Sequence, residues 1–562
     1  MSDYLGSPLR DRRSLRRAVV LLALLLALAL VAVGGSLLRP ESAVPQPARS
    51  AVVGRTSVVC TVPPPAQPTP SPGPTTASPG TPGASAPATP DLSAPTPPGP
   101  GATPSANPGS AASPSTTRAP AAPPTPGAGV PPSDGASVGP PSAVSAVTVR
   151  QGGQGGTVTA VPLGAGTGED AQQLQLSVHG TGQRLTSVTR PVVLQAEGAM
   201  ASALSGVVAS TAGSGETAGL MAAPCLAPAT EQWFAGLGSN DADRTELILS
   251  NPDDAQAEVD LRFYGPNGRV VVPGSPGVVV RAGETRTVSV SGLVQSPGPV
   301  SVAVRASEGR VSVAARRLRT QARQPAGADW QTPSAAPTTD VVIPGVPGGR
   351  GRRVLQVVNP GTERAAVSVE VLGLSGAFAP AGAATVDVPA ESTAEVELTT
   401  GLAGESGSIR LRSGLPVSAA VVSTSERDGA GTDLAVQSAQ PPLVRQGVSA
   451  VATDAASTAS ELVLSNGGDA DAAVTFEVVS YEGVSLRRDD ILLAAGSSAT
   501  RRLTSPGPSY VVVTVPDGSS VVGSVTLTQP EGAVAGLATV SLTSPDVASR
   551  APRVEQDPAV GR

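Results

Sequence analysis

The sequence predicts an all-β protein of tandem immunoglobulin-like β-sandwich repeats, preceded by an N-terminal transmembrane helix and a long disordered proline-rich loop. Three observations support this fold class. Aromatic residues are only 2% of the 562 residues, so any core is built from Val, Leu, Ile and Ala, and abundant β-branched residues favour strands. Short alternating runs of polar and apolar residues end at turn-forming residues roughly every 8 to 12 positions. One strand-and-turn motif occurs three times.

An apolar segment near the start predicts a membrane anchor. Residues Ala18–Leu38 carry no charge and follow a cluster of arginines between residues 10 and 17. As a helix, this segment is about 31 Å long, enough to cross a hydrocarbon core of roughly 30 Å. The positive flank predicts a cytoplasmic N-terminus and an extracellular body. Secretion after cleavage is the alternative, because Ala32-Val33-Gly34 resembles a cleavage site, although the apolar run continues beyond it.

Residues 61–145 are predicted to be disordered. Pro, Ala, Ser, Thr and Gly dominate this segment, and charged residues are rare. Such a composition buries too little apolar surface to offset the chain entropy and favours polyproline II conformations. The functional interpretation is a spacer through the cell wall, and the alternative is a tolerated low-complexity insertion.

Two cysteines, Cys60 and Cys225, flank the proline-rich segment. In an oxidising compartment two lone cysteines are expected to pair. Zinc would need more ligands than the single His179 supplies, and one histidine is a weak partner for two candidate catalytic thiols. A bridge would make the proline-rich segment a loop that hangs from a folded domain. Two free thiols would instead support a stalk beneath the domains.

The threefold motif is the strongest sign of domain organisation. An apolar strand ends in Asn followed by Pro or Gly, with Asn251, Asn359 and Asn466 at equivalent positions 108 and 107 residues apart. This pair is typical of a turn, because Asn caps its own backbone and Pro or Gly sets the dihedral angles. Each copy then predicts a β-sandwich of roughly 100 residues. A propeller is disfavoured, since three or four blades of this size would be too few and too large.

These patterns divide the chain into nine predicted segments. They are a cytoplasmic basic tail (1–17), a transmembrane helix (18–38), a juxtamembrane segment and first strand (39–60), a disordered segment (61–145), a degenerate leading β unit (146–230), β-sandwich repeats (231–325, 338–428 and 442–545) and a disordered tail (546–562).

The sequence contains no recognisable catalytic or cofactor motif. It has no G-x-S-x-G elbow, no H-E-x-x-H pair and no P-loop, and its glycine clusters lead into predicted strands rather than helices. We therefore expect no catalytic residue, no cofactor and no metal site. His179 is expected in a surface turn. Calcium at the acidic turns near Asn251 and Asn466 is disfavoured, because the turn at Asn359 has one carboxylate beside an arginine.

Two further features concern possible partners. Trp233 and Phe234 are adjacent in a chain that is poor in aromatic residues. Core packing near Cys225 is the favoured interpretation, and a surface for carbohydrate stacking is the alternative. The net charge of −6 argues against a nucleic-acid partner, because phosphate binding needs a basic surface.

Four short motifs resemble those of an uncharacterised actinobacterial family of membrane-anchored or secreted proteins, known only as a domain of unknown function. The motifs are Val58-Val59-Cys60, Ala223-Pro224-Cys225, Trp233-Phe234-Ala235-Gly236 and Leu249-Ser250-Asn251-Pro252. The resemblance covers about residues 45–60 and 145–545, and the third copy departs from it with Asn466-Gly467 in place of Asn-Pro. It implies an envelope protein of a high-GC Gram-positive bacterium and carries no established activity.

Taken together, these features predict a single-pass envelope protein whose sandwiches form a non-catalytic binding or scaffolding module. The expected partners are the membrane, through Ala18–Leu38, and cell-wall polysaccharide or another envelope protein. The alternative is a hydrolase that acts on cell-wall glycans with two carboxylates from separate strands. A deep cleft with two carboxylates facing one another would favour that alternative.

Overall fold

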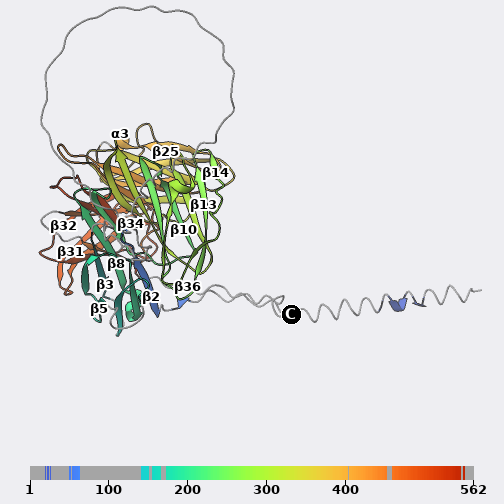
Figure 1. Cartoon of the computed structure of the whole chain (residues 1–562), viewed down its shortest axis with the longest axis horizontal. Coiled ribbons are helices and arrows are strands. Elements are labelled where there is room, and N and C mark those ends of the chain that lie inside the picture. The colour runs from blue at the N-terminus through green and yellow to red at the C-terminus, as the bar shows by residue number, and fades with distance from the viewer. Residues whose placement is uncertain are drawn as a thin grey trace, which may run out of the picture. The chain divides into compact units, whose positions relative to one another are not determined.

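The prediction of an all-β fold is confirmed by a computed structural model of the chain (Figure 1). It describes residues 19–20, 22–24, 26, 50–51, 54–63, 141–150, 155–165, 173–402, 404–451, 458–545 and 549–550. The predicted cytoplasmic tail (1–17), most of the predicted transmembrane helix (18–38), most of the proline-rich segment and most of the C-terminal tail lie outside these residues. No helix in the described part of the chain has the length and apolar character needed to span a bilayer.

Strands form where the sequence alternates. In β13 (Ala257–Gly265), Val259, Leu261 and Phe263 point into the core, and Asp260 and Arg262 between them are exposed. This period of two is what a strand with one buried face requires. The same alternation recurs in β22 (Ala365–Gly373) of the next copy. The result is a set of antiparallel sheets that pack as β-sandwich-like pairs.

The described residues between 55 and 60 and between 142 and 224 form the leading copy of this arrangement, with two four-stranded sheets. The first sheet has the order β2 (Arg55–Cys60), β7 (Val192–Gly198), β4 (Gly156–Pro162), β5 (Leu174–Leu176), and the second has the order β6 (Gly182–Val188), β3 (Ser142–Thr148), β8 (Leu204–Ala212), β9 (Gly219–Pro224). One 3-10 turn, η2 (Ala199–Ser202), links β7 to β8. β3 begins inside the segment predicted to be disordered (61–145), so the leading copy starts earlier than the predicted boundary at 146.

The first and second repeats follow the same plan. The first sheet of the first repeat has the order β10 (Glu231–Leu237), β17 (Val300–Glu308), β13, β14 (Gly268–Val270), and β15 (Val278–Val280) also pairs with β13. Its second sheet has the order β11 (Ser239–Asn240), β12 (Asp243–Ser250), β18 (Ser312–Gln321), β19 (Gln324–Gln331), and β16 (Thr285–Ser289) also pairs with β12. The short helix α2 (Val290–Leu293) follows β16. The second repeat comprises β20 (Thr338–Val346), β21 (Arg353–Asn359), β22, β23 (Gly376–Phe378), β24 (Thr385–Val388), β25 (Ser392–Glu397), α3 (Thr399–Leu402), β26 (Gly407–Ser425) and β27 (Asp433–Ser438). Its 19-residue strand β26 belongs to both layers and joins them into one eight-stranded sheet.

The third repeat returns to two separate sheets. Their orders are β28 (Gln446–Val451), β33 (Ser509–Thr514), β30 (Ala472–Ser480), β31 (Ser485–Leu493), and β32 (Ser498–Leu503), β29 (Ala459–Asn466), β34 (Val521–Thr528), β35 (Leu537–Ser541). A separate pair, β1 (Ser50–Ala51) with β36 (Ser549–Arg550), joins residues near the two ends of the chain. The strand orders of the leading copy and of the third repeat match element for element, so the leading copy is complete, with β2 as its first strand.

The four copies contact one another in a closed cycle, which the sequence did not predict. The last strand of each copy is β9, β19, β27 or β35, and each of these contacts the next, with β35 returning to β9. We call this meeting point of the four strands the hub. Of the hub strands, β19 extends beyond the predicted repeat boundary at 325, and β27 lies wholly beyond the predicted boundary at 428. They were missed because buried polar residues interrupt their apolar pattern.

Candidate functional site

The predicted disulfide is present and fixes the end of β2 to the residue that follows β9. Cys60 and Cys225 are bonded across 165 residues of sequence, and both are buried. Gly206 on β8 allows this close approach, because a Cβ at that position would lie 2.8 Å from the Cys225 sulfur. The strands on either side of the proline-rich segment, β2 and β3, therefore belong to the same folded copy.

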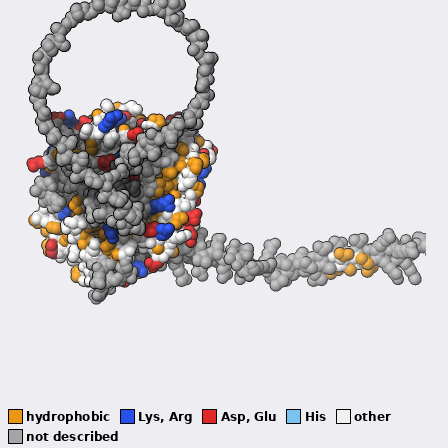
Figure 2. Space-filling model, viewed as in Figure 1, with side chains coloured by type: hydrophobic (Ala, Val, Ile, Leu, Met, Phe, Trp, Pro, Cys, Tyr) orange, Lys and Arg blue, Asp and Glu red, His pale blue; other side chains and the backbone are white. Residues whose placement is uncertain are grey.

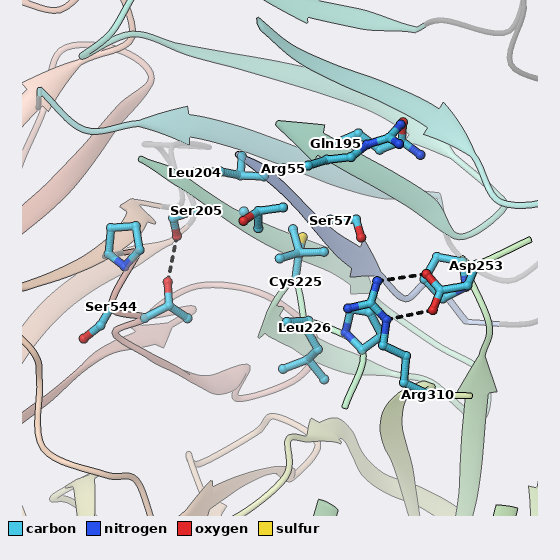
Figure 3. A pocket seen from close by; sticks show the side chains of 18 of the residues that line it. Arg55, Ser57, Gln195, Leu204, Ser205, Cys225, Leu226, Asp253, Arg310 and Ser544 are labelled. Carbon is cyan, nitrogen blue, oxygen red and sulfur yellow. Dashed lines mark hydrogen bonds and ion pairs between the residues drawn. The ribbon is translucent and has the colours of Figure 1, made fainter. Parts of the chain in front are cut away.

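A pocket of about 920 Å³ lies beside this disulfide (Figure 3). Three copies build it. The leading copy contributes β2, Gln195 of β7, the start of β8 and the segment after Cys225, the first repeat contributes the turn after Asn251 and Arg310, and the third repeat contributes residues 543–545. A hydrogen bond between the hydroxyls of Ser205 and Thr543, 2.9 Å apart, joins the leading copy to the third repeat at one wall. We call this cavity the β2 pocket.

The charged groups of the β2 pocket are mostly paired at its rim. Arg310 donates two hydrogen bonds to Asp253, from Nε to Oδ2 at 2.7 Å and from Nη2 to Oδ1 at 3.0 Å, and these bonds raise the pKa of the guanidinium (Figure 3). The second carboxylate, Asp254, follows Asp253 on the same turn. Glycoside hydrolysis needs two carboxyl groups on opposite sides of the bond that is cleaved. Neighbouring residues of one turn do not provide that arrangement.

The three motif asparagines make the same contacts in each repeat. All are buried, with 0 to 1% of the surface of Asn251, Asn359 and Asn466 exposed. Each side-chain oxygen accepts the N–H two residues later, at 3.0, 3.0 and 2.9 Å. Each amide nitrogen donates to the carbonyl four residues later, at 2.8, 2.7 and 2.7 Å, and to a carbonyl at the end of a neighbouring strand. These asparagines therefore close a turn, and Asn251 holds the turn that forms the rim of the β2 pocket.

Other residues singled out in the sequence lie away from the pocket lining. Trp233 and Phe234 are buried, and Trp233 stacks on Tyr264 with ring centroids 5.8 Å apart, in agreement with core packing. The predicted place, near Cys225, is wrong for Trp233, because it packs with Val358 and Leu434 of the second repeat. His179 is half-buried in the turn between β5 and β6. Among the described residues, no group of three or more His, Cys, Asp or Glu side chains is placed to hold a metal ion. On the face shown in Figure 2, acidic and basic side chains are interspersed.

Sequence reasoning missed two carboxyl groups at the hub, Asp329 on β19 and Asp433 on β27. Both are 0% exposed. The oxygens of Asp433 accept four backbone N–H groups, one from the last strand of each copy: Leu220 (2.8 Å), Ala328 (3.3 Å), Leu434 (2.8 Å) and Leu537 (2.9 Å).

The hub carboxyl groups are also unusual electrostatically. Burial raises the pKa of Asp433 to about 7, although its four N–H donors act in the opposite direction. Burial likewise raises the pKa of Asp329 well above its usual value. Gly219 makes room for this contact, because a Cβ there would lie 2.3 Å from Asp433 Oδ1. The hub carboxyl groups have a structural role, because their oxygens accept backbone N–H groups of the strands that meet there. The sequence signal for them is weak: Asp329 lies between Ala328 and Trp330, and Asp433 precedes the apolar run Leu434-Ala435-Val436.

Comparison with known proteins assigns the chain to a family. No curated protein matches the sequence. Residues 178–504 match DUF5719, described as a family of unknown function. The match covers more than half of the 562 residues and runs from the end of β5 to the end of β32. It includes the whole of the first and second repeats and all three motif asparagines. The chain therefore belongs to DUF5719, a family of unknown function.

Proposed function

We propose that this protein is a non-catalytic extracytoplasmic binding module, anchored in the cytoplasmic membrane of an actinobacterium through Ala18–Leu38. In this proposal the four copies are immunoglobulin-like sandwiches that act as a rigid frame, and the β2 pocket holds a partner in the envelope. The observation that carries the proposal is the pocket itself, which three copies build around a buried disulfide. Disulfides form and persist in oxidising compartments, which supports the extracytoplasmic placement.

The pocket lining supports binding rather than catalysis. Hydroxyl groups of Thr56, Ser57, Ser205 and Ser544 and the amide of Gln195 supply neutral hydrogen-bonding groups. The carboxylate of Asp253 is already held by Arg310. A ligand site of this kind combines apolar walls with a few polar groups that fix orientation. The hydrolase alternative lacks its main requirement, since the two carboxylates of the pocket come from one turn.

A protein partner fits this site better than wall polysaccharide. Carbohydrate-binding surfaces commonly present an aromatic ring for stacking, because its face is apolar and its edge is polar. Among the described aromatic residues only Phe378 is exposed, at 39%, and it lies in the second repeat, outside the pocket lining. We therefore propose another envelope protein as the partner.

Photocrosslinking in living cells tests this function. A photoreactive amino acid replaces Ser544 in the pocket, and a matched control replaces Val271, which is 83% exposed on the first repeat. We expect Ser544 to form a protein adduct that Val271 does not form. A glycan adduct at Ser544, or the same adducts from both positions, would contradict the proposal. For the location, we expect protease added to wall-stripped cells to digest the β-rich body, and protection of that body would refute an extracytoplasmic site.

A further inference from the structure

We propose that the β2 pocket binds an extended polypeptide segment, which adds as a strand to the free edge of β2 at Arg55 and Ser57. This inference rests on the proposed function and names the partner's chemical class. An extended peptide that pairs with a sheet edge gains affinity from main-chain hydrogen bonds and specificity from alternate side chains. Three observations lead to it: the direction of the β2 backbone groups, the proline that ends the existing pairing, and the apolar wall behind the edge.

The first observation is that one edge of β2 has backbone groups aimed into the pocket. β2 is the edge strand of its sheet, and β7 is the only strand of that sheet that pairs with it. Gly54 faces β7, because its carbonyl accepts the Gly198 N–H at 3.0 Å. Successive residues of a strand direct their backbone groups to opposite edges. Arg55, Ser57 and Val59 therefore direct their N–H and C=O groups away from β7.

Val59 confirms this direction, because it pairs on that outer edge with the segment after Cys225. Its N–H donates to the Leu226 carbonyl at 2.8 Å, and the Leu226 N–H returns a bond to the Val59 carbonyl at 2.9 Å. The same outer groups of Ser57 and Arg55 have no backbone partner within the described part of the chain. Both residues line the β2 pocket.

The second observation explains why the pairing stops. In the antiparallel register set by Val59 and Leu226, the residue opposite Ser57 is Pro228. Proline has no N–H and so donates nothing to the Ser57 carbonyl. The chain then turns away, and Ala229 pairs with Val311 of the first repeat instead. Pro228 thus ends the pairing, and the pocket lies where the next part of that strand would run.

The third observation is the wall that faces the open edge. Leu204 and Leu226 line the pocket together with Ser57 and Arg310 (Figure 3). Side chains of an added strand alternate between two directions. One set would contact Leu204 and Leu226, and the other would lie toward the Arg310–Asp253 pair. The cavity of about 920 Å³ is within the usual size range of ligand sites, about 300–1,000 Å³.

A single substitution separates strand addition from other modes of binding. Ser57→Pro removes the N–H that points into the pocket and leaves the bonds between β2 and β7 intact, because those bonds come from residues 54, 56, 58 and 60. The matched control, Ser57→Ala, keeps the N–H and removes only the hydroxyl. The probe is a fluorescein-labelled dodecapeptide. It is selected from a displayed library of random sequences against the whole chain in detergent, and the photocrosslinker at Ser544 shows whether it binds in the pocket.

We expect Ser57→Pro to weaken peptide binding at least tenfold and Ser57→Ala to change it less than threefold. N-methylation of each peptide amide in turn, measured with the unaltered protein, provides a second test that does not depend on the variant folding. Strand addition predicts that binding is lost at two positions that lie two residues apart, because alternate amides face β2 and only Ser57 and Arg55 have free outer groups. If the two Ser57 variants weaken peptide binding equally, and the methyl scan shows no sensitive positions two residues apart, strand addition is overturned. The proposed function would still stand. If no library peptide crosslinks at Ser544, strand addition is overturned. If Ser544 also forms no protein adduct in living cells, the proposed function is overturned as well.

Discussion

Removing the side chain of Asn359 is expected to destabilise the second repeat strongly. Asn359→Ala deletes four hydrogen bonds. The amide nitrogen donates to the carbonyls of Glu363 at 2.7 Å, Val388 at 3.2 Å and Pro389 at 3.1 Å, and the side-chain oxygen accepts the Gly361 N–H at 3.0 Å. A typical intramolecular hydrogen bond contributes about 1 kcal/mol net, and a buried group left without a partner costs about 1 to 3 kcal/mol. Since Asn359 is 0% exposed, the free energy of unfolding should fall by about 3 to 5 kcal/mol.

Urea unfolding followed by tryptophan fluorescence measures this change. Trp233 is a suitable probe, because it packs in one cluster with Val358, the residue that precedes Asn359. Thr362→Ala, an exposed change in the same turn, is the control and should alter the free energy of unfolding by less than about 0.5 kcal/mol. Asn359→Asp keeps the acceptor oxygen but directs a negative charge at two carbonyls, so it should cost at least as much as alanine.

The repeat offers an internal check on this reasoning. Asn251 and Asn466 make equivalent bonds in the first and third repeats. Alanine at either position should therefore cost a similar amount to alanine at Asn359. A loss of less than 1 kcal/mol at all three positions would mean that water replaces these bonds, and the structural role assigned to the motif would be wrong.

Three further predictions concern the disulfide, the hub and a buried ion pair. Replacing Cys60 and Cys225 by serine should lower the free energy of unfolding by up to about 5 kcal/mol in the chain-entropy model, because the bond closes a loop of 165 residues, and reductant should then have no further effect on urea unfolding. The pKa of Asp433 is about 7 in the folded protein and about 4 in the unfolded chain, so this group stabilises the fold fully below pH 4. The free energy of unfolding should therefore fall by about 4 kcal/mol as the pH rises from 4 to 7. Asp433→Asn should reduce that slope, and a urea series across this range that shows an unchanged slope would contradict the assignment. Arg317→Met should cost about 3 kcal/mol in thermal or urea unfolding, because it leaves Asp243, which Arg317 binds at 2.8 and 2.7 Å, without its main partner.

The local features of the fold were predictable from the sequence, because they depend on residues close together in the chain. Alternation in stretches such as Val259 to Phe263 indicated strands, and the spacing of Asn251, Asn359 and Asn466 indicated the repeats. The disulfide was predictable for a different reason. A chain with two cysteines offers only one intramolecular pairing.

The closed cycle of copies and the pocket were not predictable in the same way. β19 and β27 carry Asp329 and Asp433, and a carboxylate in a short strand resembles a loop until its four N–H partners are known. Three of the four N–H partners of Asp433 come from strands that are about one or two repeat lengths away in the sequence, and the fourth is the neighbouring Leu434. The pocket likewise combines β2, the Asn251 turn and residues 543–545. Its one local signal is Pro228, whose significance appears only once the register between β2 and Leu226 is known.

The contacts of Asp433 have a consequence for how such a protein evolves. Solenoid proteins gain or lose repeats readily, because each unit touches only its neighbours. Here one carboxyl group is shared among all four copies, through Leu220, Ala328, Leu434 and Leu537. Duplicating or deleting a copy would leave that group with a missing or a surplus partner. A change in the number of copies would therefore require a change at Asp433 as well, whereas changes in loops and surfaces away from the hub would not.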